Sequence, residues 1–339
     1  MDVIQLTRRL IDIPSVTESE IAIAEFITGR LAADGFRVRR QELGGGRANI
    51  FASAGGPIDV ILCSHMDTVP PFFPCREDAE YLFGRGACDT KGSIAAMISA
   101  GSSLRSAGFD RIGFLFVAGE ETDSCGARAA VSLNPGSRFL IIGEPTGNKL
   151  ALAHKGVLLL KVKTRGVAAH SAFPHLGESA VHRLLDVLQS IRAIAWEEDP
   201  TLGASFINIG WIEGGAEANV IAAEASARIM IRCAVPASRV LERVLEAIGE
   251  RAVCEVVSKA DPFRFGRRPG YETTVLPFGT DAPHLTGFGE TFLIGPGRPE
   301  DAHTDGEKVA KRALVSAVEI YRKLVLDLAS EPVRKESRS

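Results

Sequence analysis

Histidine and acidic residues follow the apolar, strand-like runs of this sequence. The run ILCSH at 61–65 ends in His65, and Asp67 stands two residues later. The same arrangement recurs further along the chain, at Asp89 in GRGACDTKG, Glu120 and Glu121 after RIGFLFVAG, Glu144 in IIGEP and His303 in GPGRPEDAHTDG. If these runs are strands of one parallel sheet, their side chains meet at its carboxyl edge, where open α/β sheets bind ligands.

A crevice that holds several carboxylates calls for cations. Uncompensated carboxylates repel one another, and their pKa values rise. Imidazole and carboxylate ligands without cysteine suit zinc, or a neighbouring ion such as cobalt or manganese. Five ligands exceed what a single catalytic zinc normally takes from protein, which favours two ions that share a bridging carboxylate. These five residues are His65, Asp89, Glu121, Glu144 and His303.

Each of these residues, taken alone, also fits a structural role. A single histidine at a strand end is most often a hydrogen-bonded structural residue. Glu120 and Glu121 could lie in a solvated loop or begin a helix. Asp89 ahead of Lys91 could form a turn with a local ion pair. The functional hypothesis therefore depends on the coincidence of all of them at the strand ends of one predicted sheet.

The apolar runs predict an α/β fold with a mainly parallel sheet and flanking helices. Near-continuous hydrophobicity is typical of strands that are covered on both faces. The capping-box pattern TESE at 17–20 predicts a helix that ends near Gly35, and a closing helix is expected over 305–328. The segment KGSIAAMISAGSSLRSAG is compatible with a helix between the first two strands. The strand-like runs are IDVILCSH, RIGFLFVAGEE, RFLIIGE and ETFLIGPG.

A second pattern begins near Val157. Its order of strand-like and helix-like segments is β-α-β-β-α-β, which is the ferredoxin-like α+β unit. We therefore predict a catalytic metal-binding domain in two parts, 1–156 and 266–330, interrupted by an inserted lid or dimerisation domain at 157–265. The polar residues 331–339 are predicted to form a flexible tail.

Composition narrows the class of protein. The 339 residues carry a formal net charge of -3, which gives no overall attraction to nucleic acid or an anionic membrane, so a small molecule is the expected partner. The sequence shows neither a signal peptide nor a membrane-spanning run, and we expect a cytoplasmic location. The six scattered cysteines predict reduced thiols. The stretch GGGR at 44–47 lacks the pattern of a nucleotide-binding loop and is predicted to be a turn.

Six motifs together suggest a family. They are SHMDTVP, GRGACDTKG, AGEETDSCGA, IIGEPTGNKLALAHKG, GVAAHSAFP and GPGRPEDAH. In this order they resemble the motifs of the di-zinc amidohydrolases and metallopeptidases that include acetylornithine deacetylase, succinyl-diaminopimelate desuccinylase, aminoacylase and carboxypeptidase G. The resemblance runs over about residues 1–325, and GEPT followed by AHKG is most similar to acetylornithine deacetylase. It implies a zinc-exopeptidase-like domain with two divalent ions, zinc or alternatively cobalt.

The resemblance also implies roles for the residues at the strand ends. His65, Asp89 and Glu144 would bind one metal ion. The second ion would be bound by Glu121 and His303, with Asp89 as the bridge. Asp67 would orient the ring of His65. Glu120 matches the general base, which takes a proton from the attacking water and passes it to the leaving amine.

Three residues of the predicted inserted domain match further positions of the family. His170 in GVAAHSAFP resembles the histidine that, in dimeric relatives, stabilises the oxyanion in the partner's active site. Asn219 in EANVI and Arg232 in MIRCAV resemble substrate-contacting residues, and a guanidinium suits capture of an α-carboxylate. From the residues alone, a surface histidine in a flexible loop is the favoured interpretation of His170, and Arg232 could equally be a surface strand residue. The resemblance implies a homodimer.

The leading hypothesis is metal-dependent hydrolysis of an N-acyl amino acid. The most favoured substrate is N-acetylornithine, which would release acetate and ornithine for arginine biosynthesis. A succinyl-diaminopimelate desuccinylase, an N-acetyl-lysine deacetylase and a dipeptidase are alternatives within the same family, because loops set the preference for the acyl group and the side chain. A non-catalytic binding protein is disfavoured because every residue that the mechanism needs is present.

Overall fold

The computed structural model describes residues 1–332 and divides into two compact units. Unit 1 contains Met1–Leu152, Phe265–Thr274 and the described residues from Thr280 onward, whereas unit 2 contains Ala153–Arg264 and Val275–Gly279. The short return into unit 2 at Val275–Gly279 has no counterpart in the sequence-based division. Of the predicted tail at 331–339, residues 333–339 lie outside the described part of the chain.

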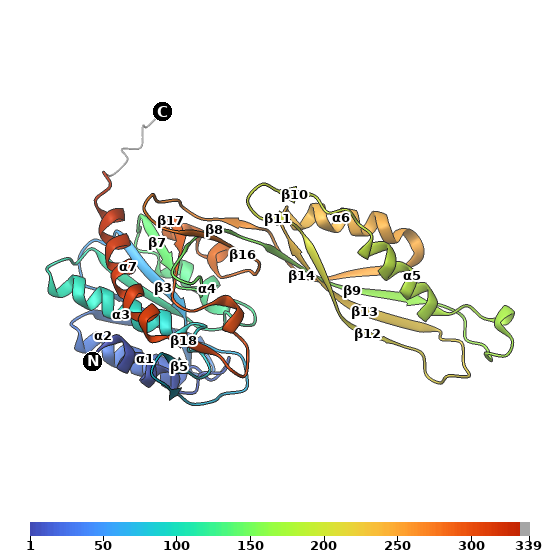
Figure 1. The fold of residues 1–339 in the computed structure, drawn as a ribbon, viewed down its shortest axis with the longest axis horizontal. Helices are drawn as coiled ribbons and strands as arrows, with labels where there is room; N and C mark the ends of the chain where they lie inside the picture. The colour runs from blue at the N-terminus through green and yellow to red at the C-terminus, as the bar shows by residue number, and fades with distance from the viewer. Residues whose placement is uncertain (333–339) are drawn as a thin grey trace. The chain divides into compact units, whose positions relative to one another are not determined.

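A six-stranded mixed sheet runs through unit 1 (Figure 1). Its order is β1-β2-β6-β3-β7-β17, in which β6, β3, β7 and β17 are parallel to one another, β2 pairs antiparallel with β6, and β1 pairs antiparallel with β2. The strands are β1 (Arg37–Gly44), β2 (Arg47–Ser53), β3 (Val60–His65), β6 (Ile112–Val117), β7 (Phe139–Ile142) and β17 (Glu290–Leu293). The four predicted strand-like runs form the parallel part, so the α/β fold is confirmed, with an antiparallel extension that makes the sheet mixed.

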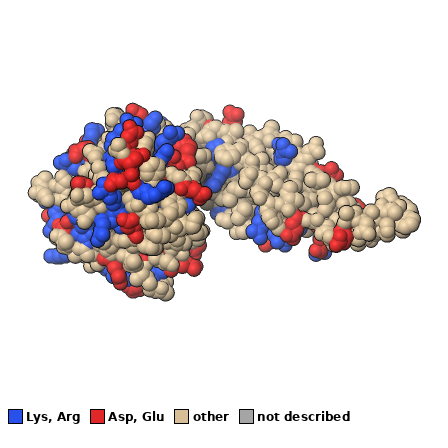
Figure 2. All heavy atoms as spheres, turned by 60° about the horizontal axis from the view of Figure 1, so that its bottom comes forward, with Lys and Arg blue, Asp and Glu red and all other residues tan. Residues whose placement is uncertain are grey.

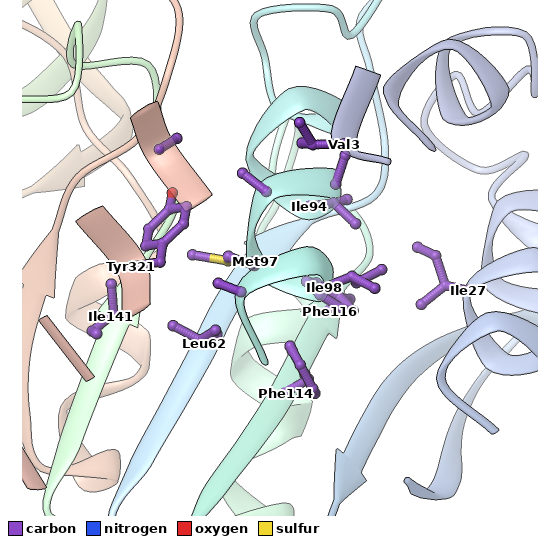
Figure 3. Packing of buried hydrophobic residues seen from close by; sticks show 14 of the residues in the cluster. Val3, Ile27, Leu62, Ile94, Met97, Ile98, Phe114, Phe116, Ile141 and Tyr321 are labelled. Carbon is purple, nitrogen blue, oxygen red and sulfur yellow. The ribbon is translucent and has the colours of Figure 1, made fainter. Parts of the chain in front are cut away.

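The core of unit 1 lies between this sheet and its helices. Every residue of β3 and β6 is buried, as expected for strands covered on both faces. The helices are α1 (Val3–Ile11), α2 (Ile21–Ala33), α3 (Lys91–Ser106), α4 (Cys125–Ala130) and α7 (Lys311–Ala329). Figure 3 shows apolar side chains of α3, among them Met97 and Ile98, directed toward Leu62 of β3 and Phe116 of β6.

Three helices depart from the sequence-based predictions. Helix α1, which was not predicted, begins at a capping box formed by Asp2 and Gln5. Helix α2 begins at Ile21 with Glu20 as its N-cap, so the predicted capping box at 17–20 does not form, and the hydroxyl of Thr17 donates to Asp67 instead. The closing helix α7 begins at Lys311, since strand β18 (Lys308–Ala310) occupies part of the predicted range.

Unit 2 contains the predicted ferredoxin-like unit. Its four-stranded antiparallel sheet has the order β12-β13-β9-β14. Strands β9 (Gly156–Arg165), β12 (Phe206–Gly214), β13 (Glu224–Cys233) and β14 (Val253–Ala260) alternate with helices α5 (Ala180–Arg192) and α6 (Ala237–Ile248) in the predicted order. Apolar residues at alternate positions of β9 and β13 are buried in one cluster with residues of both helices. The opposite face of the sheet carries the charged residues of these strands.

The remaining strands form three small sheets. Strands β4 (Arg76–Glu77) and β5 (Tyr81–Phe83) join β18, and β10 (Glu198–Asp199) pairs with β11 (Gly203–Ala204). Strand β8 (Leu150–His154) lies between β15 (Phe263–Arg264) and β16 (Thr273–Leu276). Within residues 1–332, no helix combines the length and the apolar character that crossing a membrane requires.

One glycine sets how closely α3 approaches the sheet. A Cβ atom at Gly101 would lie 2.3 Å from Cζ of Phe114 on β6, so the helix backbone rests directly on an aromatic ring. The ring of Phe114 is itself packed edge-on against Phe36 and stacked on Phe116. It therefore has little room to move aside.

We expect Gly101→Ala to destabilise unit 1. The added methyl group overpacks the core, which typically costs about 1–3 kcal/mol and outweighs the gain in helix propensity. Gly29→Ala is the matched control, because Gly29 lies in α2 with nothing within 4 Å of its Cβ position, and its helix should gain up to about 1 kcal/mol. Urea unfolding of both variants measures the two effects. Equal stability of Gly101→Ala and the wild type would contradict the close packing.

Candidate metal centre

The parallel strands of unit 1 bring the predicted ligands to one edge of the sheet. His65 ends β3 and pairs with Val117 at the end of β6. The chain continues from β6 to Glu120 and Glu121, while β7 leads to Glu144. Asp89 lies just before helix α3, and its peptide bond to Thr90 is cis.

His65 and Asp89 are in direct contact. Nε2 of His65 lies 3.0 Å from Oδ1 of Asp89 and 3.8 Å from Oε1 of Glu144. Nδ1 of the same ring lies 2.9 Å from the main-chain carbonyl oxygen of Asp67. This contact at Nδ1 fixes the ring so that Nε2 points at the two acids.

His303 reaches Asp89 from the other side. Nε2 of His303 lies 3.3 Å from Oδ2 of Asp89 and 3.0 Å from Oε2 of Glu121. Each oxygen of Asp89 therefore faces a different imidazole, His65 through Oδ1 and His303 through Oδ2. This is the arrangement that a carboxylate bridging two ions requires. The side chain of His303 is half-exposed, whereas that of His65 is buried.

The donor atoms fit divalent metal ions. One atom each from His65, Asp89 and Glu121 can be chosen such that all lie within 4.8 Å of one another, and imidazole with carboxylate is a ligand set that zinc-like ions bind. The pKa values of the neighbouring acids also favour bound cations. Burial raises the pKa of Glu120 and of Glu144 well above the usual value, and nearby carboxylates add to the rise although His65 opposes it. Cations at this edge would relieve that repulsion.

Asp67 organises the loop that carries Glu120 and Glu121. Its Oδ1 accepts hydrogen bonds from the backbone N–H groups of Gly119 and Glu120, at 2.9 and 3.1 Å. Its Oδ2 accepts from the backbone N–H of Glu121, at 3.2 Å, and from the hydroxyl of Thr17, at 2.8 Å. The nearest carboxylate oxygen lies 3.6 Å from Nδ1 of His65, farther than the carbonyl oxygen. In this geometry Asp67 holds the His65 ring mainly through its main chain, and its carboxylate fixes the loop.

Glu120 is placed beside the predicted ligands without being tied to them. Its carboxylate makes no hydrogen bond within the described chain, 1–332, although its backbone N–H is held by Asp67. Glu121, the next residue, contacts His303. A partly buried carboxylate that is next to the ligands and has no hydrogen-bond donor among residues 1–332 is suited to proton transfer.

Thr17 is a site-supporting residue that the sequence analysis assigned to a different role. The pattern TESE predicts a capping box at the start of the following helix, which begins only at Ile21, after the pattern. The hydroxyl of Thr17, however, is used by Asp67, 50 residues away in sequence. The pattern of the sequence carries no signal for this contact.

Unit 2 brings His170 and Asn219 together on neighbouring loops. His170 forms a β-bridge with Val220, and the backbone N–H of Ser171 donates to the carbonyl of Asn219 at 2.9 Å. Nδ1 of His170 accepts from the backbone N–H of Ala172 at 3.1 Å. His170 and Asn219 are both exposed, so their side chains are available to a ligand.

Arg232 lies at the other end of strand β13 from this pair. The loop with Asn219 precedes β13, whereas Arg232 is next to the last residue of the strand and pairs with Phe206 and Val157. Lys155, which the sequence analysis did not single out, shares this end of unit 2, and its Nζ lies 4.7 Å from the centre of the Phe206 ring. The structure thus separates Arg232 from His170 and Asn219 within unit 2.

Comparison with known proteins gives consistent results. Residues 61–327 match the model of the peptidase family M20/M25/M40. The chain is 35% identical over 337 residues to a peptidase M20 domain-containing protein of Schizosaccharomyces pombe, covering 96% of this chain and 84% of that protein. It is 33% identical over 375 residues to a probable carboxypeptidase of Emericella nidulans, covering 95% and 88%.

The fold also matches solved structures. The aminopeptidase PepT from Bacillus cereus superposes with a TM-score of 0.81 at 21% sequence identity, over 96% of this chain and 98% of that one. At this level of identity the similarity concerns the fold. The relatives are similar in sequence as well, and the family model covers most of the chain. They show that the chain is a metallohydrolase that acts on amide bonds and belongs to the M20/M25/M40 peptidase family.

Proposed function

We propose that the enzyme cleaves the amide bond that joins an acyl or peptidyl group to a C-terminal amino acid. The observation that carries the proposal is the contact of Asp89 with His65 through one carboxylate oxygen and with His303 through the other. His65, Asp89 and Glu144 would hold one divalent ion, and Asp89, Glu121 and His303 the second. Zinc is the favoured ion and cobalt the alternative, since both accept this ligand set.

Glu120 is the residue proposed to move the proton. When bound, the metal ions polarise the scissile carbonyl and lower the pKa of the attacking water. Glu120, whose pKa is raised by burial, would be available as the base because neighbouring cations would favour its charged form. Glu120 then takes the proton of the water and returns it to the nitrogen of the leaving amine.

Two cations of unit 2 support recognition of a substrate carboxylate. Lys155 is buried and Arg232 is half-buried, and burial lowers the pKa of both. Neither has an acidic partner within ion-pair distance among residues 1–332. Buried cations are normally paired, so an anionic ligand is the expected partner at this end of the sheet. A free α-carboxylate on the substrate would supply it, which favours C-terminal amino acids as leaving groups.

This substrate class includes N-acyl amino acids and dipeptides. N-Acetylornithine remains a candidate within it, as do N-succinyl-diaminopimelate and N-acetyl-lysine. The similarity to a probable carboxypeptidase supports the carboxylate requirement and gives no preference for an acetyl group. The family resemblance of GEPT and AHKG is the support for N-acetylornithine.

The length of strand β13 supports a homodimer. Asn219 precedes the strand and Arg232 lies near its end. The eight steps from Glu224 to Arg232 alone span about 26 Å at the usual rise of a strand, which exceeds the size of an N-acyl amino acid. If His170, Asn219 and Arg232 all contact one substrate, two copies of the chain must supply them. His170 would then stabilise the oxyanion in the site of the partner.

We expect chelator-sensitive amine release from N-acyl amino acids and dipeptides after reconstitution with Zn²⁺ or Co²⁺. The panel is N-acetylornithine, N-succinyl-diaminopimelate and glycyl-leucine, each compared with its C-terminal amide. Without the carboxylate, Arg232 and Lys155 lack an anionic partner, so the amides should react about 100-fold more slowly or worse. Equal rates for the acids and the amides would contradict the carboxylate requirement, and no cleavage of any member would contradict the proposed substrate class.

We expect Glu120→Gln to lower kcat by a factor of about 10²–10⁴, the usual contribution of general acid–base catalysis. The amide keeps the size of the side chain but cannot accept the proton. Metal content, measured by atomic emission on the purified variant, should equal that of the wild type, because Glu120 is not a proposed ligand. A Glu120→Gln variant with wild-type turnover would remove this residue from the mechanism.

We expect His170→Ala and Arg232→Ala to restore activity when they are mixed. Each homodimer lacks one required group at both sites, whereas a heterodimer retains one complete site. Random assembly should give about a quarter of the wild-type activity, because about half of the dimers are mixed and each has one working site of two. The measurement is activity after joint refolding or co-expression, with each variant alone as the control. Absence of any recovery would contradict a site shared between copies.

A further inference from the structure

A buried carboxylate behind the metal centre is bound to the main chain of Asp89. Oε1 of Glu307 accepts two hydrogen bonds, from the backbone N–H groups of Cys88 and Asp89, both at 3.1 Å. The side chain of Glu307 is fully buried. Its hydrogen bond to the main chain of Asp89 fixes the backbone from which the Asp89 carboxylate projects.

Arg85 holds the second oxygen of Glu307. Nη1 of Arg85 lies 2.6 Å from Oε2, and its Nε donates to the carbonyl of Pro71 at 3.2 Å. The guanidinium also lies over the ring of Phe73, 4.8 Å from the ring centre. With only 2% of its side chain exposed, Arg85 is as enclosed as Glu307. Both carboxylate oxygens of Glu307 are therefore hydrogen-bonded, one to the backbone at Cys88 and Asp89 and the other to a fixed guanidinium.

Glu307 also connects the segment that carries His303. It follows His303 by four residues, and its carbonyl oxygen accepts from the backbone N–H of Gly84 at 3.0 Å. The next residue, Lys308, begins the pairing of β18 with β5 at Phe83. One residue thus ties the loop of Asp89 to the segment of His303, although 218 residues separate Glu307 from Asp89.

We propose that Glu307, held by Arg85, is a positioning residue that sets the distance between Asp89 and His303 and so the geometry of the two-metal site. The proposal rests on the proposed roles of Asp89 and His303 as metal ligands. Its chemical basis is that both carboxylate oxygens of Glu307 accept hydrogen bonds, one from two backbone N–H groups and the other from a guanidinium. Only a carboxylate accepts on both oxygens, and groups that hold ligands in this way commonly change metal affinity by about ten- to a hundredfold.

The test is Co²⁺ binding to the full-length, metal-free protein. In Glu307→Gln, the amide nitrogen must face either Arg85 or the two backbone donors, so one of the contacts is lost. We expect the affinity for at least one Co²⁺ ion to fall about ten- to a hundredfold, with a changed visible absorption spectrum of the bound Co²⁺. At a saturating concentration of metal, the variant should show a larger fold-change in kcat, which falls, than in KM, because the contacts with the substrate stay intact.

Asp59→Asn is the matched control. Asp59 is a mostly buried carboxylate paired with Arg111, and it directly precedes β3, at the end of the strand opposite to His65. This variant should lose stability in urea unfolding while it keeps wild-type Co²⁺ affinity and spectrum. A loss of Co²⁺ binding in the control as large as that in Glu307→Gln would overturn the proposal, because general destabilisation would then suffice.

If Glu307→Gln does not fold, Glu307→Asp is the alternative variant for the same measurement. The shorter side chain keeps a charge for Arg85 but cannot reach both partners, and it should show the same loss of Co²⁺ affinity. Wild-type Co²⁺ affinity and spectrum in whichever variant folds would overturn the positioning role. A wild-type protein that binds no Co²⁺ would instead refute the proposed metal centre itself, so the two failures are distinguishable.

Discussion

Burying several carboxylates at one edge of a sheet is the constraint on which the rest of unit 1 depends. A buried carboxylate is costly unless it is hydrogen-bonded or paired with a cation. Asp67 meets this condition with three backbone N–H groups and a hydroxyl. Glu307 meets it with two backbone N–H groups and Arg85. Among residues 1–332, the carboxylates of Glu144 and Glu120 accept no hydrogen bond, and burial raises the pKa of each although the nearby His65 opposes the rise. The hydrogen-bonded carboxylates hold the site in place, and metal ions would relieve the repulsion among the others.

The elements that carry the predicted metal ligands have to be rigid. A metal site tolerates only small displacements of its ligands, so the groups that hold them must themselves be fixed by packing. The strand of His65 is buried along its whole length, and the loop of Glu121 is fixed by Asp67. Helix α3, which starts just after Asp89, rests on Phe114 at Gly101 without an intervening side chain. On the face seen in Figure 2, basic and acidic residues are intermixed over unit 1, whereas most of the surface of unit 2 in view is uncharged.

The sequence predicts what depends on local pattern and misses what depends on distant contacts. The parallel strands follow from continuous apolar runs, and His65, Asp89, Glu121 and His303 are predicted as ligands because each stands at or beyond the end of a strand-like run. Other features escape such patterns. Thr17 serves Asp67 across 50 residues, and Arg85 meets Glu307 across 222. Lys155 is hidden for a similar reason, since a lysine at the end of a strand becomes unusual only once the fold buries it.

Unit 2 adds a constraint of another kind, the stiffness of an extended strand. β13 is paired on both sides, with β12 and β9, so it cannot fold back to bring its two ends together. A cation at one end and a histidine with an asparagine at the other cannot serve one small substrate within a single copy. β12, the strand at the edge of the sheet, leaves Trp211 and Ile212 partly exposed. An exposed edge with apolar side chains is a surface that proteins normally cover. If a second copy covers the edge at β12, the same association both buries these apolar side chains and completes the active site.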